Sequence, residues 1–433
     1  MVTGAMQESW RNTILAGLAN YIDAGSIVAG SAALALWKAQ YGLSDTFIGL
    51  IAAFSANAIS AGVGALIGGI LCDKYGRKKI YQYDMLFYAF GMTWLVFASA
   101  PWMIVLGFVL VGLAVGADIP ASWSLIAELA PADRRGKHSG VAQVLWYLGP
   151  VVVLLSFLIL EPLGVVAARV VFAHLAVLAI VLTLLRSRMK ESTRWQAARA
   201  EKGSRPASWR VLLQPQHVKS MAFLVGMYGL WNLWAGTNGF FFPYILRTVG
   251  KQTQTVSVAL QAANFILTMF SIYFIFMKLV DRTNQRLLFG LSAALQISGM
   301  LLLALFPLTL PVAILHVTLM AVGVGFGAQS FFQLWSAELF PTLVRSTAQG
   351  VTFAIVRVGL GLWSFFVPVL TATGFHTLAW ILTGFLVAST LVGLMGAPRN
   401  EGKSLEQLDE ERTRSRLADL PVSGGAAKRP ATS

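Results

Sequence analysis

The stretch 127–131, Ala-Glu-Leu-Ala-Pro, recurs 210 residues later as Ala-Glu-Leu-Phe-Pro at 337–341. In each copy an arginine follows the glutamate by seven residues, Arg135 in the first and Arg345 in the second. A second pair of segments, 73–78 and 281–286, begins with Asp73 and Asp281 and repeats at an offset of 208. Two repeats at nearly one offset predict a duplicated unit whose halves have the same orientation.

Long apolar stretches surround these repeats. Hydrophobic residues make up 56% of the 433 residues and charged residues 12%, whereas a soluble domain carries about 25% charged residues. Each apolar stretch is close to the roughly 20 residues that a membrane-crossing helix needs. Twelve such stretches are predicted, at 12–37, 46–71, 80–99, 101–126, 137–160, 165–186, 217–246, 255–280, 287–306, 311–336, 346–370 and 376–396.

The predicted fold is therefore an all-α membrane protein with twelve transmembrane helices in two pseudo-symmetric six-helix bundles. We expect an N-terminal bundle at 1–186, a polar and basic inter-domain loop at 187–216 and a C-terminal bundle at 217–398. The polar tail at 399–433 ends in Gly, Ala, Pro and Ser, a composition typical of disorder.

Basic residues are distributed unevenly over the predicted loops. The net charge is +14, and of the 33 Lys and Arg residues those in predicted outer loops are Lys38, Arg169, Arg247 and Lys251. Arg357 lies within a span, and the others fall on the opposite side. Because basic loops resist translocation, this bias predicts cytoplasmic N- and C-termini in the cell membrane. The charge thus indicates topology, and no nucleic-acid partner is expected.

Several function classes are excluded by missing motifs. Cys72 is the single cysteine, and no His, Asp or Glu spacing indicates a metal site. A phosphate-binding Gly-x-x-x-x-Gly-Lys-Ser/Thr run is absent, which disfavours ATP-driven pumping. No nucleophile and base are paired, so an enzyme is not expected and no cofactor is implied. A secondary transporter remains, with a drug exporter or a transport-like sensor as less favoured alternatives.

Charged residues at the predicted cytoplasmic helix ends suggest a gate. We interpret them as acid–base pairs that close the inner side and separate when it opens, with static interfacial anchoring as the alternative. The gating candidates are Asp73, Arg77, Glu128, Arg135, Asp281, Glu338 and Arg345.

Three ionisable residues fall well inside spans: Asp23, Asp118 and Arg357. Such a charge costs about 2.5–3.5 kcal/mol at the bilayer centre and must be paired, neutralised or solvated. We hypothesise that Asp23 and Asp118 line a central cavity and couple transport to protons, with Arg357 at the cavity edge. The alternatives are a fixed hydrogen-bonding role for Asp23 and helix capping or pairing for Asp118. Arg357 could instead form a structural ion pair with one of these acids or recognise an anionic substrate.

Neutral polar side chains within spans could bind hydroxyl groups, because amides both donate and accept hydrogen bonds. An aromatic side chain could stack on a ring face. The substrate-binding candidates are Gln143, Asn232, Asn238, Gln261, Gln333 and Trp335, with Gln143 and Asn238 first.

These motifs resemble the major facilitator superfamily over nearly the whole chain. The stretch 69–79, Gly-Ile-Leu-Cys-Asp-Lys-Tyr-Gly-Arg-Lys-Lys, looks like that family's loop between spans two and three. Stretches 21–30, 136–143, 190–195 and 398–405 are similar to motifs of its sugar porter branch. The branch implies alternating access, proton coupling by Asp23 and a sugar contact by Gln143.

The resemblance departs from the branch in span four. Phe108 stands where the branch has an arginine that pairs with the first-span aspartate. Stretches 20–23, 116–118 and 333–338 look most like bacterial myo-inositol-type transporters. The resemblance therefore implies a monomeric bacterial inner-membrane importer of a small polyol or sugar by proton symport. A proton-coupled transporter of organic anions or sugar acids is the alternative.

Overall fold

The structure is a computed structural model that describes residues 2–187, 189, 191–201, 209–364, 366, 367, 370, 374–398, 405, 407, 408 and 410. Within this part of the chain all regular secondary structure is helical, as predicted. Seven described helical segments are long and apolar enough to cross a membrane, and two of them, Thr255–Leu279 and Leu310–Glu338, consist of consecutive shorter helices. The other predicted spans correspond to more polar helices or to helices interrupted by a short break.

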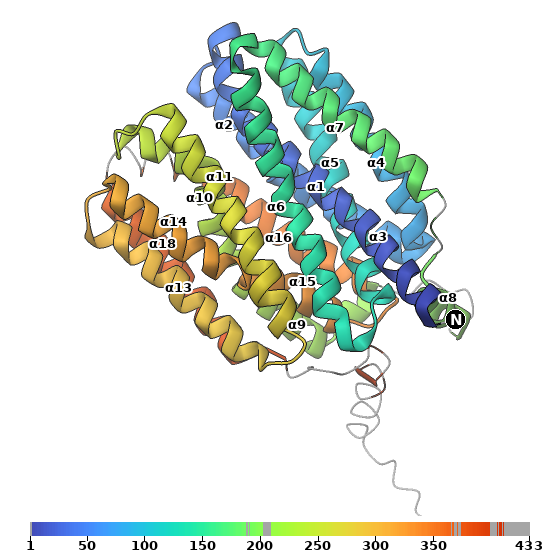
Figure 1. Ribbon diagram of the computed structural model, residues 1–433. Coiled ribbons are helices and arrows are strands. Elements are labelled where there is room, and N and C mark those ends of the chain that lie inside the picture. The colour runs from blue at the N-terminus through green and yellow to red at the C-terminus, as the bar shows by residue number, and fades with distance from the viewer. Residues whose placement is uncertain are drawn as a thin grey trace, which may run out of the picture.

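The first six predicted spans form one bundle (Figure 1). α1 packs against α5, α6 and α7, while α4 packs against α5 and α7. Close backbone contact explains some of the glycines: a Cβ on Gly149 would lie 2.1 Å from the Tyr21 carbonyl oxygen. The helices are α1 (Val2–Tyr41), α2 (Asp45–Ala53), α3 (Ile59–Tyr75), α4 (Arg77–Val96), α5 (Pro101–Leu129), α6 (Arg135–Leu160) and α7 (Val165–Arg186).

The last six predicted spans form the second bundle, in which α13 packs against α14 and α18. Two spans contain a π-helical segment, η4 (Val225–Gly229) and η5 (Ile272–Phe276). The α-helices are α9 (Pro215–Leu224), α10 (Leu230–Thr248), α11 (Gln254–Ser271), α12 (Met277–Leu279), α13 (Gln285–Leu305), α14 (Leu310–Gly325), α15 (Ala328–Glu338), α16 (Arg345–Ser364) and α18 (Phe375–Gly396).

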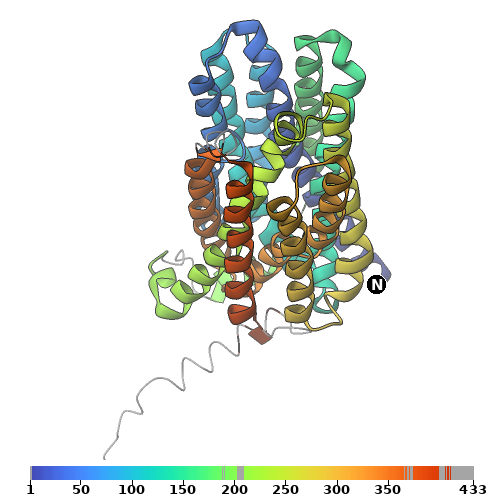
Figure 2. The same cartoon turned by 90° about the vertical axis from the view of Figure 1, so that its left-hand side faces the viewer.

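The bundles meet chiefly where α3 packs against α16 and α6 against α11, and α5 also contacts α16. The N-terminus and α8 (Thr193–Glu201) lie towards one end of the molecule, and the start of α9 lies at the same end (Figures 1 and 2). We call it the predicted cytoplasmic end, because the basic loops belong to it. The exact domain boundaries stay a prediction, and the predicted disorder of 399–433 concerns residues that lie almost entirely outside the described ones.

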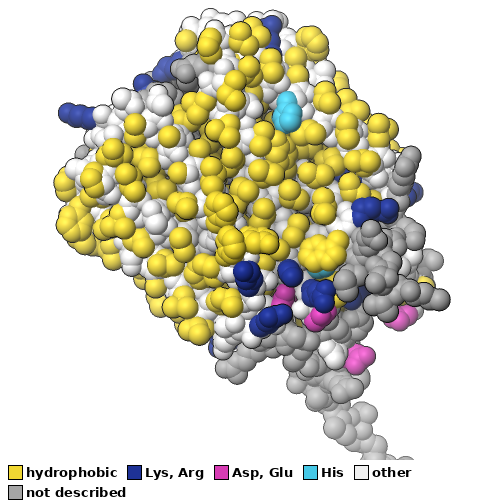
Figure 3. All heavy atoms as spheres, viewed as in Figure 1, with side chains coloured by type: hydrophobic (Ala, Val, Ile, Leu, Met, Phe, Trp, Pro, Cys, Tyr) yellow, Lys and Arg dark blue, Asp and Glu magenta, His cyan; other side chains and the backbone are white. Residues whose placement is uncertain are grey.

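The outer surface suits a bilayer. Apolar side chains cover most of the face seen in Figure 3, and charged side chains gather near its margins. Many large hydrophobic residues are exposed on the lipid-facing helices, including Phe90 on α4 and Phe274 in η5. Burial of these side chains in hydrocarbon replaces the burial that a soluble protein would achieve in its core.

Candidate functional site

A cavity of about 120 Å³ lies between the two bundles. It is bordered by α1 and α6 on one side and by α10, α11 and α16 on the other. Asn57, in the interruption between α2 and α3, also lines it, as do Val324 of α14 and Gln329 of α15. The residues that line it are Ala24, Ile27, Val28, Ser31, Asn57, Trp146, Tyr147, Pro150, Trp231, Asn232, Trp234, Ala235, Gly236, Asn238, Gly239, Asn264, Phe265, Thr268, Val324, Gln329 and Arg357.

Uncharged polar groups in the cavity come mainly from the C-terminal bundle. Asn232 and Asn238 on α10, two of the predicted substrate-binding residues, line it. Asn264 on α11 and Gln329 on α15 add two further amides. Tyr228 donates to the Gln329 Oε1 at 2.7 Å, which holds that amide in place. Amide groups beside aromatic rings can bind a small molecule that carries several hydroxyl groups.

Gln143 and Gln333 lie outside the cavity lining. Gln143 on α6 donates through Nε2 to the Gln333 Oε1 on α15, so the pair joins the two bundles. Both side chains are buried, and each keeps one amide atom without a hydrogen-bond partner. They stand about one helical turn closer to the predicted cytoplasmic end than Tyr147 and Gln329. The pair therefore separates the cavity from the predicted cytoplasmic end.

The other two predicted contacts are not in the cavity either. Gln261 on α11 is buried, and neither polar atom of its amide has a hydrogen-bond partner. Trp335 on α15 stacks on Phe331 with ring centroids 4.6 Å apart, and its Nε1 donates to the Gln285 Oε1 at 2.7 Å. Trp335 therefore belongs to the interior of the C-terminal bundle in this conformation. For Trp335 the prediction missed that its ring faces α13 and not the other bundle.

Arg357 on α16 lines the cavity, in agreement with its predicted place at the edge. Its Nη1 donates to the Asn57 carbonyl oxygen at 3.2 Å and to the Asn57 side-chain oxygen. Its guanidinium lies 4.4 Å from the centre of the Phe353 ring. The alternative of an ion pair with Asp23 or Asp118 was wrong, because the described contacts of Arg357 are with an amide and an aromatic ring.

Asn57 was missed by the sequence reasoning. It lies in the interruption between α2 and α3, within Phe-Ser-Ala-Asn-Ala at 54–58. No glycine or proline stands there, so nothing in the composition marks a break in the helix. The break brings the Asn57 side chain beside Arg357 of the opposite bundle.

Asp23 and Asp118 do not line the cavity, and that prediction was wrong. Both are fully buried inside the N-terminal bundle. The Arg186 Nη1 lies 3.3 Å from the Asp118 Oδ1 and 3.7 Å from the Asp84 Oδ1. The physical reason is the helix face: the depth of a residue in a span can be read from sequence, whereas the direction of its side chain depends on packing.

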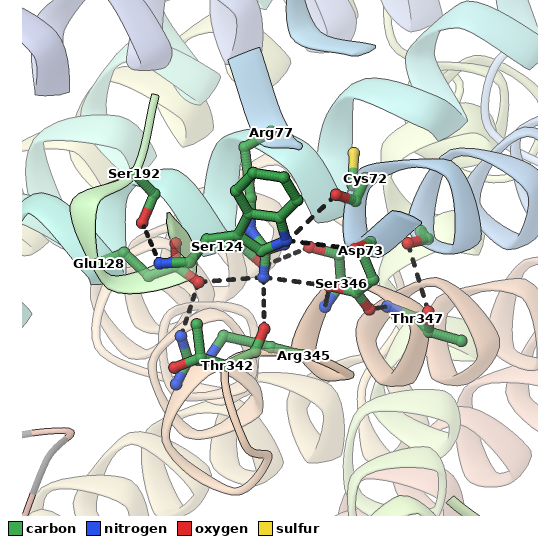
Figure 4. Close-up of polar contacts among 12 residues, drawn as sticks. Cys72, Asp73, Arg77, Ser124, Glu128, Ser192, Thr342, Arg345, Ser346 and Thr347 are labelled. Carbon is green, nitrogen blue, oxygen red and sulfur yellow. Dashed lines mark hydrogen bonds and ion pairs between the residues drawn. The ribbon is translucent and has the colours of Figure 1, made fainter. Parts of the chain in front are cut away.

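The gating candidates meet at the predicted cytoplasmic end. Glu128 at the end of α5 accepts hydrogen bonds from Arg77 at 3.2 Å and from Arg345 of the other bundle at 2.7 Å. Arg77 is also paired with Asp73 at 3.0 Å. Figure 4 shows Arg77 between Glu128 and Asp73, with Arg345 and Thr342 close by. On the other side of the interface, Arg135 pairs with Glu338 at 2.8 Å. These side chains are nearly or fully buried.

The duplicated motifs exchange partners across this interface. The glutamate of each Ala-Glu-Leu-x-Pro copy pairs with the arginine of the other copy, Glu128 with Arg345 and Glu338 with Arg135. The motif aspartates follow the same rule, since each one caps the first turn of a helix in the opposite bundle.

Asp73 provides the first of these caps and Asp281 the second. Asp73 accepts from the backbone N–H groups of Ser346 and Thr347 in α16, at 3.3 and 2.7 Å. Asp281 accepts from those of Gly136 and Lys137 in α6, at 2.9 and 3.0 Å. Burial raises the pKa of Asp73, which follows the second predicted span, to about 6, although Arg77 and Thr347 oppose the shift. Burial likewise raises the pKa of Asp281, against the two N–H donors. Breaking these contacts would separate the bundles at this end.

A sequence model of the Major Facilitator Superfamily matches residues 13–364. The chain belongs to the major facilitator superfamily. Members of this family are membrane transporters and not enzymes, so this chain is a multi-pass transporter of the cell membrane.

Two curated relatives and one solved structure show the range of its similarities. The chain is 47% identical over 410 residues to the minor myo-inositol transporter IolF of Bacillus subtilis, covering 93% of each chain. It is 26% identical over 378 residues to the alpha-ketoglutarate permease of Escherichia coli, covering 81% of this chain and 84% of the permease. The solved proton:xylose symporter XylE superposes with a TM-score of 0.79 at 17% identity, covering 94% of this chain and 99% of XylE. That likeness supports the twelve-helix major facilitator fold.

Proposed function

We propose that this transporter imports an inositol-like polyol by proton symport, through alternating access of one central cavity. The observation that carries the substrate class is the set of cavity amides, Asn232, Asn238, Asn264 and Gln329, beside five aromatic residues. A cyclic polyol offers hydroxyl groups that donate and accept, together with a ring face that packs on an indole. The 47% identity to a myo-inositol transporter over nearly the full length supports the same substrate class.

The conformation described here is closed at the predicted cytoplasmic end. Glu128, Arg345, Arg135 and Glu338 hold the bundles together there, and the Gln143–Gln333 pair lies between them and the cavity. In the proposed cycle, substrate binds in the cavity from the outer side. The gate pairs then separate, and Gln143 and Gln333 turn their unpartnered amide atoms to the substrate as it leaves.

A proton is the favoured coupling ion. Asp23 is fully buried, and neither of its carboxylate oxygens has a hydrogen-bond partner. An unpaired buried carboxylate favours the protonated state, so a proton can stabilise it.

The test is uptake of labelled myo-inositol into proteoliposomes with an imposed pH gradient. We expect wild type to accumulate substrate, Asp23→Asn to exchange but not accumulate it, and Gln143→Ala to transport with weaker apparent affinity. Normal accumulation by Asp23→Asn would contradict the proton role, and an absence of myo-inositol uptake by wild type would contradict the substrate class.

Arg357 supports a second candidate, import of an organic anion. Its guanidinium lines the cavity without an acidic partner among its described contacts, so a substrate carboxylate could replace Asn57 there. The 26% identity to an alpha-ketoglutarate permease is compatible with this alternative. Competition against labelled myo-inositol separates the two: neutral polyols should compete under the first proposal, and carboxylates under the second. Arg357→Gln should abolish binding of carboxylates and leave binding of neutral polyols within a few fold.

A further inference from the structure

Four ionisable side chains that do not belong to the gate pairs form a cluster inside the N-terminal bundle. Arg186, the last residue of α7, contacts Asp118 of α5 at 3.3 Å and Asp84 of α4 at 3.7 Å. Its guanidinium also lies 3.5 Å from the centre of the Tyr81 ring. Asp23 of α1 interacts electrostatically with the other three charged groups. We call Asp23, Asp84, Asp118 and Arg186 the acid cluster.

The charges of the acid cluster do not balance. Three carboxylates face one guanidinium, and all four side chains are buried. Both oxygens of Asp23 lack a hydrogen-bond partner, as does the hydroxyl of the buried Tyr81. An uncompensated buried charge costs several kcal/mol. Two of the three acids must therefore carry protons for the cluster to be neutral.

Among the residues that the structure describes, Arg186 is the cation that acts electrostatically on Asp23. The titratable groups that face the cluster from the surrounding helices are Cys72 of α3, Tyr81 and Tyr88 of α4 and, next to Asp23 on α1, Tyr21. Tyr21 is hydrogen-bonded to His174 of α7 at 3.0 Å. None of these groups is a cation that pairs with Asp23, which leaves Arg186 as the counter-charge among the described residues.

The cluster extends along the membrane normal. Asp23 lies near the middle of α1, whereas Asp118 is about three turns before the inner end of α5. Asp84 is about two turns from the inner end of α4, and Arg186 ends α7. Asp84 also lines a second cavity, of about 310 Å³, between α3, α4 and α5. The acids thus lead from mid-membrane towards the predicted cytoplasmic end, beside and not through the substrate cavity.

We propose that the coupling proton binds in the acid cluster and travels from Asp23 through Asp118 to Asp84 inside the N-terminal bundle, with Arg186 as the shared counter-cation. In each transfer an O–H bond breaks on one carboxylic acid and forms on the next carboxylate, and the negative charge moves back towards Asp23. Sugar porters resemble this chain but have an arginine at the position of Phe108 in span four. Here Arg186 of span six supplies the positive charge instead. This inference rests on the proposed proton symport and adds the location of the proton path.

The first test uses purified full-length protein and no substrate. Infrared difference spectra between acidic and alkaline buffer detect protonated carboxyl groups. Wild type should show a buried carboxylic-acid band near neutral pH, and Asp84→Asn should lose part of it. In Arg186→Gln the pH midpoint of this band should shift upward by about one unit or more, because the variant lacks the cation that favours ionised acids. Arg186→Lys should restore most of the wild-type midpoint.

The second test measures transport in proteoliposomes. Asp84→Asn should lower pH-driven accumulation of myo-inositol about tenfold and leave its binding within twofold, because Asp84 lies outside the substrate cavity. Asp133→Asn is the matched control, since Asp133 is an exposed acid whose partner is Arg134. If Arg186→Gln fails to fold, the double variant Asp84→Asn/Arg186→Gln removes one charge of each sign and keeps the same net charge.

The outcomes separate this inference from the proposed function. If wild type takes up no myo-inositol but the infrared band and its shifts are present, the substrate proposal fails and the proton site stands. If Asp84→Asn and Arg186→Gln leave both the infrared band and the pH profile of uptake as in wild type, the proposed proton path is wrong.

Discussion

Glu128 at the end of α5 lies 2.7 Å from Arg345 at the start of α16, so a carboxylate of one bundle neutralises a guanidinium of the other. The same carboxylate binds Arg77 at 3.2 Å within its own bundle. One acid therefore contacts two buried arginines, one in each bundle, and its loss would leave both without this partner.

Replacement of this acid should open the predicted cytoplasmic end. Glu128→Gln leaves Arg77 and Arg345 without their shared anion, and breaking a buried pair in this way costs about 3–5 kcal/mol. We expect a longer distance between spin labels on the exposed positions Lys79 and Lys219, measured by pulsed electron resonance in a Cys72→Ala background. Asp133→Asn, which removes an exposed pair, should leave the distance unchanged. An unchanged distance in Glu128→Gln would identify Glu128 as an anchor and not part of a gate.

Acid should favour the closed end. Burial raises the pKa of Asp73 from its ordinary 3.8 to about 6 in the closed conformation. An open end would hydrate Asp73 and return the pKa towards 3.8, so the closed conformation binds the proton more tightly. Between pH 6 and pH 3.8 the population with the short Lys79–Lys219 distance should therefore rise as the pH falls. A population that moves the opposite way would show that the ionised form of Asp73 closes the gate.

The cavity amides should determine affinity. Asn238→Ala removes one amide from the cavity and should weaken myo-inositol binding roughly threefold to tenfold, the effect of one hydrogen bond. Isothermal titration of the detergent-solubilised protein measures this loss directly. Gln216→Ala, an exposed amide outside the cavity, is the control. Equal affinity of Asn238→Ala and wild type would place the substrate elsewhere.

Helix packing in the first bundle should tolerate no side chain at Gly149. A Cβ there would lie 2.1 Å from the Tyr21 carbonyl oxygen, and backbone cannot move aside as a flexible side chain can. Gly149→Ala should lower the thermal unfolding midpoint and cost about 1–3 kcal/mol. Gly384→Ala meets no atom within 4 Å in α18 and should leave the midpoint equal or higher. A Gly149→Ala protein as stable as wild type would contradict the close contact of α1 and α6.

The sequence predicted the spans and the charged residues that pair at the predicted cytoplasmic end better than it predicted the lining of the cavity. The length of an apolar stretch predicts where a helix begins and ends. The repeat at 127–131 and 337–341 predicts which residues stand at equivalent helix ends, and neither prediction requires knowledge of packing. The lining of the cavity depends on which way each helix is rotated, and Trp335 and Asp23 fell on other faces.

Arg186 shows a second limit of sequence reasoning. It stands at the very end of an apolar stretch and is followed by a basic loop, so it was counted with that loop. In the structure it turns back among three acids and is buried. Asp84 and Asp118 are acids within spans that have no basic residue in the same span. They were the signal that Arg186 turns back into the bundle.

The exchange of partners between the two motif copies has a consequence for how the molecule is assembled. Neither half contains the residues that complete its own inner end: α16 needs Asp73 and α6 needs Asp281. Two polypeptides produced by severing the chain within 202–208 should therefore recognise each other when co-expressed, because each supplies the helix caps and charge partners of the other. Fusion of the two ancestral genes would then have joined halves that already bound each other through these contacts.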